Sequence, residues 1–167
     1  MLGLCALSEA VKSVKSGHLF GGSPRIAFIN GTSVGGMDLS EVFWKAHRHD
    51  PENGDLDYLR MHSPGAVTDA MAEFCRSLLP GFSFVTTIST ACSAAGNAIM
   101  YGARLIEAGL ADIVIAGGTD ALCSFTLNGF NSLRILDSEI CRPFDVSRAG
   151  LNLGEGAGYL VLSAASE

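Results

Sequence analysis

The sequence predicts an α/β fold in which a mostly parallel sheet is covered by helices on both faces. Short runs of apolar and β-branched residues alternate along the chain with longer segments that repeat apolar residues at helical spacing. Most of these short runs are nearly continuous in apolar residues, which is typical of strands buried on both faces. The chain is 48% hydrophobic and only 17% charged, whereas about 25% of residues are charged in a typical soluble domain. That composition fits either a doubly covered sheet or a surface that binds a partner.

The first half of the chain contains three predicted helices and one predicted strand. Apolar residues recur at helical spacing from Leu2 to Val14, and Gly17 ends that pattern as a glycine after a helix does. The run RIAFIN, residues 25–30, indicates a short buried strand. We further expect helices over 38–48 and 64–79, the second ended by Pro80 and Gly81, with a polar surface loop over 47–59 between them.

The second half continues the alternation of strands and helices. The β-branched run from Phe84 to Ser89 predicts a strand, and small and apolar residues at helical spacing predict a helix from about Ser93 to Ala108. Another apolar strand is expected over 112–116. Residues 126–136 are ambiguous, and a glycine-rich irregular stretch then leads to a last strand over 159–162.

Both ends of the chain look incomplete for a domain of this class. The chain opens directly into a helix with no strand before it, and it closes on an apolar strand that no later element covers. We therefore expect residues 1–167 to form one partial domain, a piece of something larger.

Charge, cysteine spacing and hydropathy argue against several classes of function. The net charge is −6 and the 11 lysines and arginines are scattered, so no nucleic-acid partner is expected. No apolar run reaches the roughly 18 residues of a membrane span, and no signal peptide is visible. The 5 cysteines are odd in number and have no CxxC spacing, so we expect no metal site and a reduced, cytoplasmic setting.

Cys92 is the residue whose position in the sequence suggests a catalytic nucleophile. It follows the predicted strand 84–89 and opens the predicted helix, and its neighbours Ala91 and Ser93 are small. Active sites of open α/β sheets lie at the carboxyl ends of strands, and a helix N-terminus favours a thiolate. Small neighbours allow a tight turn whose backbone N–H faces an oxyanion. A structural cysteine packed at a close helix–strand contact would need small neighbours too, so the spacing alone leaves both interpretations open.

Four blocks of sequence, in order and at matching separations, resemble a known enzyme family. They are TACSAAGNAI, ADIVIAGGTDAL, NGFNSLRIL and RPFDVSRAGLNLGEGAGYLVLS, and RIAFINGTSVGG precedes them. Together they are similar to the β-ketoacyl-acyl-carrier-protein synthases of the elongating type, in the thiolase superfamily. The resemblance covers nearly the whole chain.

This resemblance implies a fold, a reaction and a set of site residues. The fold would be the layered αβαβα thiolase-like fold, of which the chain holds most of the first half. Cys92 would be the nucleophile and the backbone oxyanion donor, and Asn128, Gly129 and Phe130 would line the acyl pocket. Cys92 would take an acyl chain from a carrier-protein thioester, and decarboxylation of malonyl-carrier protein would give an enolate that attacks it. No cofactor is implied. The implied partners are acyl carrier protein and, through strand 84–89 pairing with its own copy, a second subunit of a homodimer.

The histidines of this chain depart from the family pattern. The family needs two histidines after the nucleophile, whereas His18, His47, His49 and His62 all precede Cys92. We therefore expect the chain alone to be inactive in condensation. Two alternatives remain: a non-catalytic, dimer-forming half-domain, or a synthase-like partner subunit. The second is disfavoured because such subunits lack the nucleophile that Cys92 provides.

Overall fold

A four-stranded, mostly parallel sheet forms the centre of the chain. The computed structural model describes residues 1–16, 23–52, 54–79 and 81–164. Its strand order is β2-β1-β3-β4, where β1, β2 and β3 are parallel and β4 runs antiparallel to β3. The strands are β1 (Ile26–Gly31), β2 (Phe84–Ile88), β3 (Ile113–Asp120) and β4 (Gly156–Ser163).

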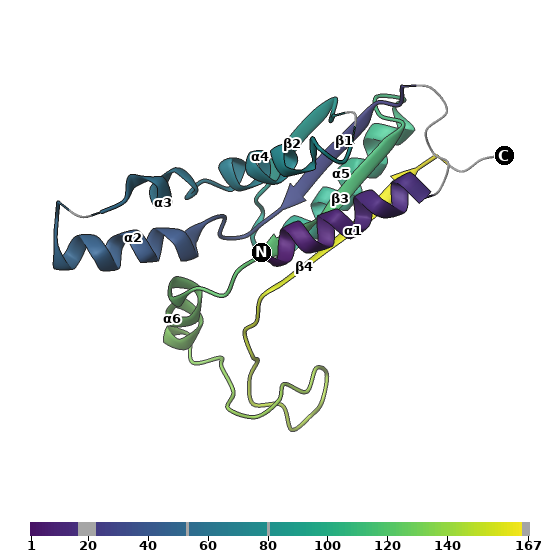
Figure 1. Ribbon diagram of the computed structural model, residues 1–167. Coiled ribbons are helices and arrows are strands. Elements are labelled where there is room, and N and C mark those ends of the chain that lie inside the picture. Colours follow the sequence, from purple (N-terminus) through teal and green to yellow (C-terminus); the bar gives the residue numbers. More distant parts are fainter. Residues whose placement is uncertain (17–22, 53, 80, 165–167) are drawn as a thin grey trace.

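Helices cover both faces of this sheet, as the sequence predicts. Helices α1 (Leu2–Ser16) and α4 (Pro64–Cys75) lie on one face, and α5 (Ala94–Glu107) lies on the other (Figure 1). Alternate residues of β1 supply the two cores, since Ile26 and Phe28 pack with α1 and α4 while Ala27 and Ile29 pack with α5. The prediction of a layered α/β fold is confirmed.

Three helices lie outside these layers. They are α2 (Met37–His49), α3 (Leu56–Arg60) and α6 (Ser124–Ser132), and a long irregular arm over 133–155 follows α6 (Figure 1). The longest helix of the chain is α1, with 15 residues. Among the residues described, no helix has the length and apolar character to cross a bilayer.

The structure corrects several predicted boundaries. The polar loop expected over 47–59 contains most of α3, whose first turn is capped by Asp55 accepting a hydrogen bond from the N–H of Asp57. Helix α4 ends at Cys75, four residues early, because turns take over before β2. Strand β3 continues through both of its glycines to Asp120 instead of ending at Ala116. Helix α6 begins two residues before the ambiguous segment 126–136 and ends within it, and Gly17 lies outside the described residues.

A buried chain of hydrogen bonds ties four elements together across the sheet. The hydroxyl of Tyr159 donates to Asn30 Oδ1 at 2.6 Å, and Asn30 Nδ2 donates to Thr68 Oγ1 at 3.0 Å. The hydroxyls of Thr87 and Thr68 are 2.7 Å apart, and Thr68 itself donates to the carbonyl of Pro64 at 3.1 Å. Because buried polar groups need partners, this chain fixes the positions of β1, β2, β4 and α4 relative to one another.

Candidate functional site

Cys92 lies at a tight turn between the carboxyl end of β2 and the first residue of α5. The turn is a short 3-10 segment, Ala91–Ser93, and the Cys92 side chain is exposed at its tip. Ala91 has a φ of 52°, in the left-handed region that non-glycine residues adopt only where the surroundings hold them. The predicted placement of Cys92 at the start of a helix is confirmed, and that helix, expected to be buried, is buried only on the face toward the sheet.

Side chains on both sides of Cys92 brace this turn. Ser93 Oγ donates to the carbonyl of Thr90 at 2.7 Å, and Asn97 Nδ2 donates to Thr90 Oγ1 at 2.8 Å and to Ser93 Oγ at 3.2 Å. Neither Thr90 nor Asn97 was predicted from the sequence. Their spacing of three and four residues from Ser93 was the available signal, because residues so spaced face one another at a helix start.

Two glycines let the first turn of α5 lie directly on the sheet. A Cβ added to Gly31, the last residue of β1, would come within 2.5 Å of the backbone of Ala94 and Ala95. A Cβ added to Gly118 on β3 would come within 2.8 Å of the Ala95 Cβ. The close approach brings Cys92 over the carboxyl ends of β1 and β3.

A hollow of about 340 Å³ lies beside Cys92. One side is formed by the Cys92 turn and the start of α5, and the other by the ends of β1 and β3 and the start of β4. Its lining is mostly backbone and small side chains, and the residues that form it are Gly31, Ser33, Ala91, Cys92, Ala94, Ala95, Gly118, Thr119, Asp120, Gly156, Ala157 and Gly158. Such a lining leaves room for an extended substrate to reach the sulfur atom.

Asp120 organises the loop at the edge of this hollow. Its Oδ1 accepts hydrogen bonds from Thr32 Oγ1 at 2.6 Å, the N–H of Ser33 at 2.7 Å and the N–H of Val34 at 3.3 Å. The loop after β1 is thereby fixed to the end of β3. Sequence reasoning missed this residue, because its partners lie 86 to 88 positions away and two of them are backbone groups.

The histidines lie elsewhere. His47 stacks on Phe43 with ring centroids 5.4 Å apart, and His62 Nδ1 lies 2.8 Å from Ser40 Oγ. His49 is exposed at the end of α2, and His18 lies outside the described residues. No histidine of the described part lines the hollow beside Cys92.

The three residues expected to line an acyl pocket all lie on α6. Asn128 and Gly129 are exposed and Phe130 is half-buried. None of them lines the hollow beside Cys92, so their role in an acyl pocket stays a prediction.

The five cysteines differ in their surroundings. All are free, with Cys5 and Cys92 exposed, Cys141 half-buried, and Cys75 and Cys123 buried. Burial raises the pKa of the Cys75 thiol. Cys92 is the cysteine that lines the hollow at the strand ends. Within the described ranges, no three histidine, cysteine or acidic side chains are grouped so that they could hold a metal ion.

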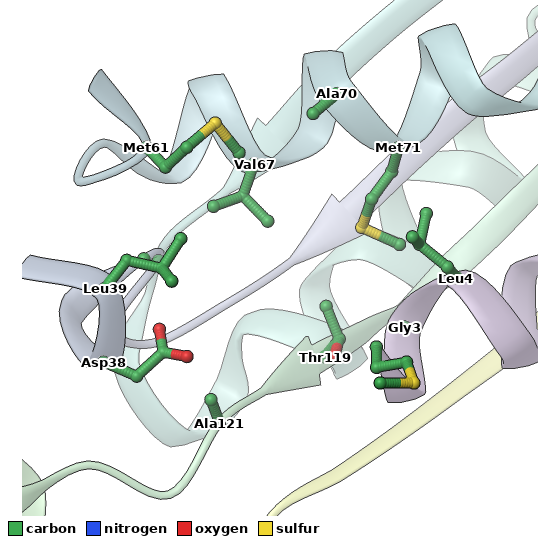
Figure 2. A pocket seen from close by; sticks show the side chains of 13 residues that line it. Gly3, Leu4, Asp38, Leu39, Met61, Val67, Ala70, Met71, Thr119 and Ala121 are labelled. Atoms are coloured by element: carbon green, nitrogen blue, oxygen red, sulfur yellow. The ribbon is translucent and has the colours of Figure 1, made fainter. Parts of the chain in front are cut away.

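A second hollow, of about 240 Å³, lies toward α1 and α4 (Figure 2). Its walls are mainly apolar, and Leu4, Leu39, Val67 and Met71 are among the side chains that point into it. It contains one carboxylate, from Asp38, and no cysteine. Of these two hollows, the one beside Cys92 is the one that contains a thiol.

Comparison with known proteins finds a matching family model and similar sequences. A model of the β-ketoacyl synthase N-terminal domain matches residues 4–167. Nodulation protein E of Rhizobium meliloti is 34% identical over 164 residues, which are 97% of this chain and 40% of that protein. The 3-oxoacyl-[acyl-carrier-protein] synthase 2 of Staphylococcus aureus is 30% identical over 169 residues, 95% of this chain and 40% of that protein.

Solved structures agree with the sequence matches. The ishigamide ketosynthase/chain length factor has a TM-score of 0.80 and 31% identity, covering 97% of this chain and 41% of the other. A ketosynthase from Xenorhabdus doucetiae, solved in complex with its chain length factor, has a TM-score of 0.79 and 33% identity, covering 98% of this chain and 41% of the other. The chain thus spans about 40% of the length of the relatives it matches.

Proposed function

The chain belongs to the β-ketoacyl synthase family, and from this premise we propose that Cys92 is the acyl-accepting nucleophile of a condensing enzyme in fatty acid or polyketide biosynthesis. The observation that carries the proposal is an exposed thiol at a strained turn, over glycines at the ends of parallel strands. That arrangement presents a nucleophile to a substrate while the small lining leaves the approach open.

The first step is transfer of an acyl group to Cys92. The thiolate attacks the carbonyl carbon of an acyl-carrier-protein thioester, a new C–S bond forms, and the carrier thiol leaves with the electron pair of the old one. The backbone N–H of Cys92 donates a hydrogen bond to the oxyanion of the tetrahedral intermediate. Acyl carrier protein as the donor is supported by the name of the Staphylococcus aureus relative.

The second step lengthens the acyl chain. Malonyl-carrier protein loses carbon dioxide, and the resulting enolate carbon attacks the acyl-cysteine carbonyl. The C–S bond to Cys92 breaks, and a 3-oxoacyl chain two carbons longer remains on the carrier. This step needs the two histidines that the family resemblance implies, and no described histidine lines the hollow. We therefore propose that the 167-residue chain carries out the acyl transfer but not the condensation. Condensation needs the remaining length found in its relatives.

A synthase-like partner subunit is the alternative role, and the exposed Cys92 argues against it. A second subunit is part of the proposal, either another copy of this chain or a chain length factor such as the one bound to the Xenorhabdus doucetiae ketosynthase. The cytoplasmic location stays a prediction, in keeping with five free cysteines.

Acyl transfer is testable on the chain itself. The protein is incubated with a straight-chain acyl pantetheine thioester, and the adduct is located by intact-mass and peptide mass spectrometry. We expect one acyl group on Cys92, none in Cys92→Ala, and an unchanged yield in Cys5→Ala, the matched exposed cysteine. Acylation of Cys5 at an equal rate, or none at Cys92, would contradict the proposal.

A further inference from the structure

Helix α6 is held to the rest of the chain by polar contacts. None of its residues is buried, and the side chains of Phe125 and Leu127 are 63% and 45% exposed. Figure 1 shows the helix standing off the sheet, beyond the carboxyl end of β3. A short helix without a buried face gains little from hydrophobic packing, so its hydrogen bonds to other elements decide where it lies.

The strongest of these contacts comes from Glu41 on α2. One carboxylate oxygen accepts a hydrogen bond from the N–H of Ser124 at 3.0 Å, and the other accepts one from the N–H of Phe125 at 2.6 Å. First-turn N–H groups have no partner inside their own helix, and the helix dipole favours a negative charge beside them. Burial raises the pKa of Glu41, but the hydrogen bonds from Phe125 and Ser124 outweigh burial and leave that pKa below its ordinary value.

The connector before α6 is anchored as well. Glu155 Oε2 accepts a hydrogen bond from the N–H of Leu122 at 3.3 Å. Cys123 is buried, and its Sγ lies 3.1 Å from Thr126 Oγ1. The connector is therefore tied to Glu155 at Leu122 and buried at Cys123, and Glu41 holds the point where the helix begins.

We propose that Glu41 is a positioning residue that sets the acyl-chain preference of the Cys92 site by fixing the N-terminus of α6 to α2. The inference rests on the proposed function and on the role that the family resemblance implies for Phe130 and its neighbours on α6 in lining the acyl pocket; these residues do not line the hollow beside Cys92 itself. Glu41 does not line the hollow beside Cys92, so it acts through the helix. Phe130 lies about 9 Å along the axis from Ser124, and a small tilt about the anchor moves Phe130 further than it moves Ser124.

The test compares Glu41→Ala and Glu41→Gln with Glu107→Gln, an exposed glutamate on α5, in the full 167-residue chain. Glu41→Gln keeps the size of the side chain and one acceptor oxygen, so it still tests the proposal if the alanine variant does not fold. Amide hydrogen exchange is followed at Ser124 and Phe125. Acylation of Cys92 is measured with short and long straight-chain acyl pantetheine thioesters, giving a maximal rate and a half-saturating concentration for each.

We expect faster exchange at both amides in the Glu41 variants, more so in the alanine variant, and no change in Glu107→Gln. The ratio of half-saturating concentrations for long and short chains should shift about tenfold in Glu41→Ala, with maximal rates and iodoacetamide alkylation of Cys92 unchanged. Unchanged exchange would overturn the anchor. Faster exchange with an unchanged ratio would overturn the role in chain preference. A lack of acylation by every thioester in the unaltered chain would overturn the proposed function and that role together, while the exchange data would still report the anchor.

Discussion

Gly31 lies directly beneath Ala94: a Cβ on Gly31 would come within 2.5 Å of the Ala94 carbonyl carbon. Contacts that close essentially never occur for a real Cβ, so the end of β1 and the start of α5 require glycine at this position. The relationship explains why the thiol two residues before Ala94 lies at the carboxyl end of the sheet instead of being held away from it.

Gly31→Ala should therefore destabilise the chain and disturb the Cys92 turn. Because the opposing atoms are backbone, the strain falls on the position of α5, and we expect a loss of about 1–3 kcal/mol in the free energy of unfolding. Urea unfolding followed by circular dichroism measures it. The control is Gly96→Ala on α5, where an added Cβ has nothing within 4 Å. That change should be neutral or stabilise by up to about 1 kcal/mol, and equal effects of the two substitutions would contradict the argument.

The parts of the fold with a local cause were predictable from sequence. Apolar or β-branched runs identified every strand named here, and the change from a β-branched run to small residues identified the Cys92 turn. The extension of β3 was missed because glycines are poor strand formers; here Gly117 lies so close to β4 that a Cβ would meet the Gly158 carbonyl oxygen at 2.0 Å, and tertiary packing overrides propensity.

The supporting residues of the site had no comparable signal. Asp120 and Glu41 accept hydrogen bonds from backbone N–H groups 83 to 87 positions away in the sequence. A backbone N–H is present whatever the residue type, so the sequence does not show which of them is a donor to a side chain. Helix α3 was missed for a related reason, since it is 5 residues long with no buried side chain, and only its cap at Asp55 marked it.

The five cysteines should react with iodoacetamide in an order set by their surroundings. Cys92 should be alkylated first because it is exposed at a tight turn beside an open hollow, and Cys5 should follow because it is exposed without that setting. Cys75 should react slowest, because it is buried and its pKa is raised by burial. Timed labelling with peptide mass spectrometry gives the order, and labelling in urea should remove the differences. Faster labelling of Cys5 or Cys141 than of Cys92 would argue against an activated thiol.

Acid should weaken the contact between the residues that precede β1 and β3, because it protonates the carboxylate of Asp112. This carboxylate accepts hydrogen bonds from the backbone N–H of Arg25 at 2.7 Å and from its guanidinium at 2.6 and 3.1 Å. The side-chain hydrogen bond from Arg25 is the main cause that lowers the Asp112 pKa from 3.8 to about 2. A lowered folded-state pKa means that the stabilisation is complete above pH 3.8 and is lost as the pH falls toward 2.

The measurement is the difference in unfolding free energy between the unaltered chain and Asp112→Asn over a pH series. We expect that difference to be largest above pH 3.8 and to close as the pH approaches 2. Asp69→Asn, an exposed aspartate on α4, serves as the control and should show little difference at any pH. A gap for Asp112→Asn that stayed constant to the lowest pH would show that the ion pair does not respond to protonation in this range.

Strand β2 is an open edge of the sheet. It pairs with β1 alone among the described strands, and FVTTI carries neither charge nor proline. Natural edges usually carry such features to prevent pairing with another chain. A second copy of this chain or a chain length factor would satisfy the unpaired backbone groups and merge two sheets into one.

A lysine at this edge should weaken that association, and the structure shows where to place it. Thr87 is unsuitable because its hydroxyl contacts Thr68 at 2.7 Å in the buried chain of hydrogen bonds, so its replacement would also damage the fold. Ser89 is exposed directly after β2. We expect the unaltered chain to be a homodimer by light scattering at micromolar concentrations, and Ser89→Lys to shift it toward monomer. Ser23→Lys, an exposed serine before β1, should not change the mass. A monomeric unaltered chain would rule out self-pairing of β2, and a dimer insensitive to Ser89→Lys would place the interface on another surface.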